Sequence, residues 1–128
     1  MARRVSIHLP GVSHAAPIPM GAKVGNVVYS SAISGHDAAT DSMPDDPAKQ
    51  AEALFKNIRT FMEVAGGTTD DIVKMDVLLK DDNLRDAINT EWLKMFPDED
   101  NRPARHAQQV PLRGRFLFQV ELVAVLDK

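Results

Sequence analysis

Residues 116–126 form an almost entirely apolar run, Phe-Leu-Phe-Gln-Val-Glu-Leu-Val-Ala-Val-Leu. Apart from Gln119 and Glu121, every residue in it is apolar, so both faces of the strand that it predicts are largely hydrophobic. Such a strand is typical of a sheet that is covered on both sides. One layer of helices covers only one side. We therefore expect the other side to be covered by further copies of the same chain.

Two helices and four further strands are expected before this last strand, which we place at 115–126. Helix 47–65 begins after a possible N-cap at Asp46 and ends at Gly66-Gly67, with apolar positions every three or four residues. A second helix is expected at 83–95. Short β-branched or alternating stretches predict strands at 5–9, 26–33, 72–79 and 104–110. This order predicts an α+β fold, a mixed sheet with both helices on one face.

The composition is that of an ordinary globular protein. The 128 residues are 44% hydrophobic and 26% charged, which predicts a single domain over residues 1–128. The absence of cysteine excludes disulfides and thiolate metal sites, and the four histidines show no metal-ligand spacing. A net charge of -3 argues against nucleic-acid binding. No apolar run reaches the roughly 20 residues of a membrane-spanning helix. We expect a cytoplasmic protein with no metal, no nucleic-acid partner and no membrane contact.

Arg105 and Glu121 stand out from the apolar pattern of the last two strands. A carboxylate inside a strand is rarely buried unless it is paired. If 104–110 and 115–126 form a hairpin around Leu112-Arg113-Gly114, Arg105 and Glu121 lie opposite each other on one face. Two interpretations are open here. The pair is a structural ion pair, or it is a site where arginine grips a small carboxylate and glutamate handles water or a proton.

Several segments, taken in order and spacing, resemble a known family. They are Gly25 to Ser31, Ala51 to Gly66, Asp70 to Leu79, Asn89, Pro103-Ala104-Arg105 and Val120 to Ala124. Together they are similar to the Rid family (reactive intermediate deaminases), also called YjgF-like or endoribonuclease L-PSP, over about residues 16–126. The resemblance implies a chorismate-mutase-like α+β fold and a homotrimer whose sheets face inward, with three clefts between neighbouring subunits.

The resemblance also implies an activity and its residues. Members of the deaminating branch hydrolyse reactive enamines and imines of the 2-aminoacrylate type to 2-keto acids and ammonia, without a cofactor. The carboxylate-binding arginine of the family falls on Arg105, and its acidic residue, which positions or activates water, falls on Glu121. Further substrate-binding positions fall on Ser31, Asn89 and Ala107. The expected partners are a small carboxylate-bearing substrate and other copies of the chain.

The chain departs from the family pattern at two of the substrate-binding positions. Ile18 stands where the family usually has an aromatic residue, and Ala107 stands where it has a small residue or cysteine. The usual aromatic residue of the family is a tyrosine, and the loss of its hydroxyl affects the expected reaction rate and the identity of the substrate. Two alternatives therefore stay open: a non-catalytic trimeric binder of small carboxylate metabolites, and a 2-aminomuconate-type deaminase. A ribonuclease, which one family name suggests, is disfavoured by the acidic charge balance.

Overall fold

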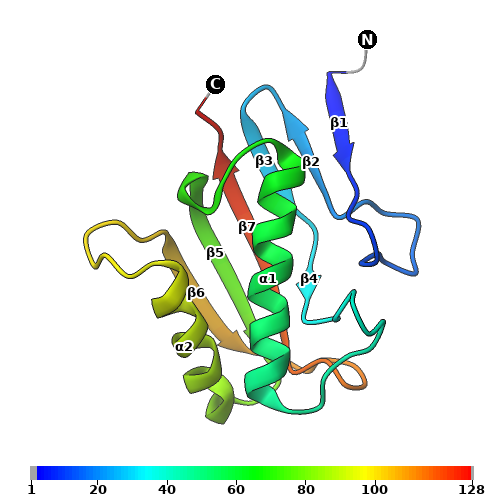
Figure 1. Ribbon diagram of the computed structural model, residues 1–128, viewed down its shortest axis with the longest axis vertical. Coiled ribbons are helices and arrows are strands. Elements are labelled where there is room, and N and C mark those ends of the chain that lie inside the picture. The colour runs from blue at the N-terminus through cyan, green and yellow to red at the C-terminus, as the bar shows by residue number, and fades with distance from the viewer. Residues whose placement is uncertain (1–2, 128) are drawn as a thin grey trace.

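The computed structural model describes residues 3–127. A mixed sheet of seven strands carries two helices on one of its faces (Figure 1). The helices are α1 (Pro47–Ala65) and α2 (Arg85–Met95). The strands are β1 (Arg4–Ile7), β2 (Gly21–Val24), β3 (Val27–Ser30), β4 (Ile33–Ser34), β5 (Ile72–Leu79), β6 (Ala104–Gln109) and β7 (Phe118–Val125). The predicted α+β class, with both helices on one side of a mixed sheet, is confirmed.

The order of the strands in the sheet is β1-β2-β3-β7-β5-β6, and the short β4 pairs with β7. β7 runs antiparallel to β3, β4 and β5, whereas β6 runs parallel to β5. The predicted hairpin between the last two strands is therefore wrong, because β5 lies between β6 and β7 (Figure 1). A parallel neighbour needs a crossover connection, and α2 supplies it between β5 and β6.

α1 has the boundaries that its end signals predict. The Asp46 carboxylate accepts a hydrogen bond from the Lys49 N–H at 3.1 Å, and Gly66 ends the helix with a left-handed φ of 97°. Its apolar stripe is buried on the sheet: Ala51, Leu54, Phe55, Ile58, Phe61, Met62 and Ala65. Within residues 3–127, neither this 19-residue helix nor α2 is long and apolar enough to cross a membrane.

The first part of the sheet differs from the prediction. The segment 26–33 forms two strands, β3 and β4, because the chain turns aside after Ser30, where the Ser30 Oγ accepts the Leu122 N–H at 2.8 Å. β2 was not predicted. It has only four residues, and half of them are Gly21 and Lys23, which are poor strand formers.

The two faces of the sheet differ strongly in β7. Phe118, Val120, Leu122 and Ala124 are buried beneath the helices. The alternate residues point to the other face, which we call the open face because no element of residues 3–127 covers it (Figure 1). Exposed apolar side chains gather there on β3 and β7: Val27, Tyr29 and Val125. This exposure agrees with the expected cover by another copy, which stays a prediction.

Candidate active site

Arg105 lies in β6, at the edge of the sheet. Its partner in β5 is Met75, which is fully buried, so the Arg105 side chain points to the face that the helices cover. There, the Arg105 Cζ lies 4.8 Å from the centroid of the Trp92 ring in α2. Its Nη1 is buried and has no hydrogen-bond partner among residues 3–127. A buried N–H without an acceptor is costly, so this nitrogen is an unsatisfied donor within the part of the chain that the structure describes.

Arg85, on α2, makes the surroundings of Arg105 more positive. Burial, and after it the charge of Arg85, lower the pKa of Arg105 from its usual value, although a guanidinium stays protonated in proteins. Arg85 donates from Nε and Nη2 to Asp82 Oδ1 at 3.2 and 3.0 Å. Two arginines and one aspartate leave one positive charge in this cluster. One carboxylate group would balance that charge.

Ala107 brings a backbone donor to the same edge. The Val110 N–H donates to the Leu79 carbonyl of β5, and N–H groups alternate in direction along a strand. The Ala107 N–H and carbonyl therefore face away from β5, along the free edge of the sheet as residues 3–127 form it. The Arg85 Nη2 lies 3.4 Å from the Ala107 carbonyl oxygen, which confirms this direction.

Asn89 belongs to the same neighbourhood through its place on α2. It is four residues after Arg85 and three before Trp92, so the three side chains share one face of the helix. Arg85 and Trp92 were not predicted as site residues, because only the parallel pairing of β5 and β6 brings them to Arg105. Their spacing relative to Asn89 was the signal that could have indicated them.

The second group of predicted residues lies at β7 and β3. Glu121 of β7 is exposed on the open face, opposite Asp76 of β5. Ser31 follows β3 and holds the preceding loop: its N–H donates to the Met20 carbonyl at 2.7 Å and its Oγ donates to the Pro19 carbonyl at 2.8 Å. That loop carries Ile18, whose side chain is half exposed. The Ser31 hydroxyl still has lone pairs to accept a hydrogen bond.

Arg105 and Glu121 of one chain lie on opposite faces of the sheet. Arg105 is in register with Met75, and Met75 is in register with Leu122, which is buried under the helices. Glu121, next to Leu122, points the other way. The predicted pairing of Arg105 with Glu121 on one face is therefore wrong, and so is the interpretation as an ion pair within one chain. A site that uses both groups needs two copies of the chain.

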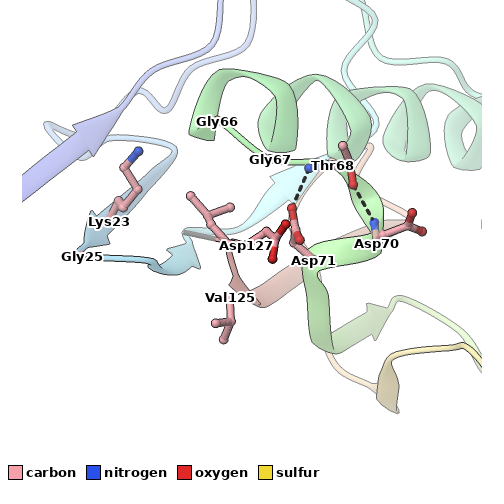
Figure 2. A pocket seen from close by; sticks show the side chains of 10 residues that line it. Lys23, Gly25, Gly66, Gly67, Thr68, Asp70, Asp71, Val125 and Asp127 are labelled. Atoms are coloured by element: carbon pink, nitrogen blue, oxygen red, sulfur yellow. Dashed lines mark hydrogen bonds between the residues drawn. The ribbon is translucent and has the colours of Figure 1, made fainter.

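A cavity of about 730 Å³ lies elsewhere, beside the C-terminal end of α1 (Figure 2). None of the predicted site residues lines it. Its charged side chains are Lys23 and three aspartates, and Lys23 already donates to the Ala65 carbonyl at 3.0 Å. This acidic lining does not suit a carboxylate ligand. Among residues 3–127, no group of three or more histidines, aspartates and glutamates is placed to hold a metal ion.

Comparison with known proteins identifies relatives over most of the chain. The model of the family described as endoribonuclease L-PSP matches residues 13–126. A RutC family protein of Haemophilus influenzae is 32% identical over 85% of this chain and 86% of its own. The 2-iminobutanoate/2-iminopropanoate deaminase of Escherichia coli K12 is 30% identical over 85% and 87%. The 3-aminoacrylate deaminase RutC of Acinetobacter baylyi is 34% identical over 76% of each.

Solved structures share the fold over nearly the whole chain. RidA from the Antarctic bacterium Psychrobacter sp. PAMC 21119 superposes with a TM-score of 0.86 at 29% identity, covering 95% of this chain and 99% of its own. TdcF of Escherichia coli, solved with bound serine, gives 0.85 at 26% identity, covering 94% and 98%. With the family model matching 114 of the 128 residues (13–126), this chain belongs to the endoribonuclease L-PSP family, also called the Rid or YjgF-like family.

Proposed function

We propose that this protein hydrolyses reactive 2-imino acids, and the enamines in equilibrium with them, to 2-keto acids and ammonia. The observation that carries the proposal is the partly buried Arg105 guanidinium, which pairs with no carboxylate among residues 3–127, leaves Nη1 without a partner there, and lies beside a second arginine, Arg85. The names of the relatives from Escherichia coli and Acinetobacter baylyi, both deaminases of small imino or aminoacrylate acids, support the reaction class. Bound serine in TdcF supports a small ligand that carries a carboxylate.

The site is proposed to lie between two copies in a homotrimer. Arg105 faces the helices and Glu121 faces the open side of the sheet, so one copy supplies the arginine and its neighbour supplies the glutamate. The exposed apolar side chains of β3 and β7 are the expected contact surface, because burying them removes apolar area from water. Size-exclusion chromatography with light scattering tests the trimer directly.

In this scheme, one set of groups binds the substrate carboxylate and another group activates the attacking water. Arg105 takes the substrate carboxylate through its free N–H donors, and the outward Ala107 N–H is the second donor to it. Glu121 of the neighbour accepts a proton from water as the water attacks the imine carbon. The C–O bond forms while the imine nitrogen gains a proton, and Glu121 passes the proton that it took to the amino group of the tetrahedral adduct. The C–N bond then breaks as the adduct hydroxyl becomes the keto carbonyl, and ammonia leaves with both protons of the water. Orientation of these partners is the main source of the rate.

An assay that makes the imine in place tests the activity. Threonine dehydratase or an amino-acid oxidase generates the unstable imine, and keto-acid and ammonia release are followed with and without the protein. We expect Arg105→Ala and Glu121→Gln to lose most of the acceleration. Arg113→Ala and Glu52→Gln change exposed residues of the same types that have no role in this scheme, and they should keep the acceleration. Full activity of Arg105→Ala would contradict the carboxylate site.

A binding protein without turnover is the second candidate, and Ile18 favours it. The Ile18 side chain is half exposed and has no group that can donate a hydrogen bond to a substrate. In that case pyruvate should raise the unfolding temperature while ammonia release stays at the uncatalysed rate. The Ile18→Tyr variant separates the two candidates, because a restored hydroxyl should increase turnover of a weak enzyme and leave a pure binder inactive.

A further inference from the structure

Trp92 is the aromatic side chain that lies against the charged group of Arg105. The 4.8 Å between the Arg105 Cζ and the Trp92 ring centroid is within cation–π range, and tryptophan is the strongest partner for such a contact. Trp92 is 9% exposed, and Arg105 is partly buried beside it. Because the indole is nearly buried and the guanidinium is partly buried, the contact is stronger than it would be on an open surface.

Trp92 is itself fixed in place by the end of α2. The Phe96 ring packs edge-on against it, with the two centroids 4.8 Å apart and an interplanar angle of 64°. Phe96 is buried, and its carbonyl accepts the Arg102 Nε–H at 2.9 Å. The indole is therefore a rigid surface for the flexible arginine side chain.

The contact leaves the hydrogen-bond donors of Arg105 free. An indole has a donor N–H and no acceptor, so it cannot accept from the guanidinium. Nη1 accordingly has no partner among residues 3–127, although it is buried. A side chain as long as arginine loses considerable rotamer entropy when a ligand orders it. A surface that orders it beforehand removes part of that cost from ligand binding.

We infer that Trp92 is a positioning residue, whose indole holds the Arg105 guanidinium ready for a carboxylate and reports its arrival. The inference rests on the proposed function, since it assigns Arg105 the carboxylate of the substrate. Trp92 is the single tryptophan of the chain, so the tryptophan fluorescence of the protein comes from this side chain alone. A carboxylate on Arg105 partly neutralises the charge beside the ring. The emission of Trp92 should then change in a saturable way.

The first experiment titrates the unaltered protein with pyruvate. Emission of Trp92 and heat of binding are measured on the same samples, and we expect the same half-saturation from both. Arg105→Gln should lose both signals, whereas Arg113→Ala should keep both. Heat of binding without any change in emission would overturn the role of Trp92 and leave the carboxylate site in place. No heat and no ammonia release would overturn the proposed function together with this inference.

The second experiment removes the aromatic ring. Trp92→Leu keeps a buried apolar side chain without π electrons, and it should weaken pyruvate binding by about 5- to 30-fold, the equivalent of about 1–2 kcal/mol. Trp92→Phe keeps a ring and should lose less. KM for the imine should rise with kcat nearly unchanged, because the carboxylate is held equally in the ground state and the transition state.

A matched variant separates positioning from stability. Phe61 is a fully buried aromatic residue of α1, distant in the fold from β6, so Phe61→Leu removes a ring without touching Arg105. It should lower the unfolding temperature and keep the affinity for pyruvate. If Trp92→Leu and Phe61→Leu bind pyruvate equally well, Trp92 is a core residue and the inference is wrong.

Discussion

Mixing two inactive variants tests whether each site is built from two copies. Arg105→Ala removes two expected charge-assisted hydrogen bonds, each worth about 1.5–3 kcal/mol, so kcat/KM should fall at least about 100-fold. Glu121→Gln removes a general base, which contributes about 10²–10⁴-fold in rate. Each variant alone should therefore be nearly inactive. Because the two residues face opposite sides of one sheet, an oligomer that contains both variants can still contain an intact site.

In the proposed trimer the three copies form a closed ring, and this arrangement sets the expected recovery of activity. A site is intact where the arginine comes from a Glu121→Gln copy and the glutamate comes from an adjacent Arg105→Ala copy. The two variants carry different affinity tags, are unfolded together in urea, and are refolded and purified over both tags. Every trimer then holds both variants and has one such junction, so about one third of the parent activity per chain should return.

The same experiment has a clear contrary result. If Arg105 and Glu121 act within one chain, every chain in the mixture lacks one of them, and the doubly tagged oligomers stay as inactive as either variant alone. Co-elution over both tags shows that mixing has occurred. A recovered activity near the parent value would contradict the scheme as well, because no arrangement in a ring of three restores every site.

Two further predictions concern the frame of the site. Gly35→Ala would place a Cβ against the backbone carbonyl of Gln50 and 2.6 Å from its Cγ, so the free energy of unfolding in urea should fall by about 1–3 kcal/mol. Gly67→Ala meets no backbone, only a Leu126 methyl and the Asp71 carboxylate that accepts the Thr68 N–H at 2.9 Å, and it should cost less. Ser31→Ala removes the hydrogen bond to the Pro19 carbonyl, which should lower the free energy of unfolding by about 1 kcal/mol. KM should rise, because the loop that carries Ile18 is held less firmly. Lowered stability with an unchanged KM would make Ser31 purely structural.

Local signals predicted the elements that end in well-defined caps. Asp46 and Gly66 set the bounds of α1, and the apolar run over Ile72–Leu79 gave β5 without error. At α2 the prediction began two residues early, because a 3-10 turn over Asp82–Leu84 precedes the helix. These signals are contained within a few neighbouring residues, so no knowledge of the tertiary structure is needed to read them.

Such local signals do not determine which distant segments pair with each other in the sheet. A turn sequence at Leu112-Arg113-Gly114 favoured a hairpin between the last two strands. In the structure, α2 connects β5 to β6, and β5 lies between β6 and β7 in the sheet. Because the predicted strand neighbour was wrong, the predicted face was wrong as well. Arg105 pairs with Met75 and shares its face of the sheet, whereas Glu121 lies on the opposite face. The apolar pattern singled out Arg105 and Glu121, and the family resemblance added the other candidate positions, which stay predictions. The contact of Arg105 with Trp92 emerged only from the three-dimensional arrangement.

The position of β7 in the sheet has a consequence for the order of folding. β7 follows all other described elements along the chain, yet it joins β3 and β4 on one side to β5 on the other. Without β7, neither the β1-β2-β3 meander nor the β5-β6 pair has its neighbour in the sheet, so both keep an unpaired strand edge until residues 118–125 have been synthesised. The pairing of β3 with β7 brings together two segments with most of the sequence between them. Formation of the complete sheet is therefore expected to be slow and open to association between incompletely folded chains.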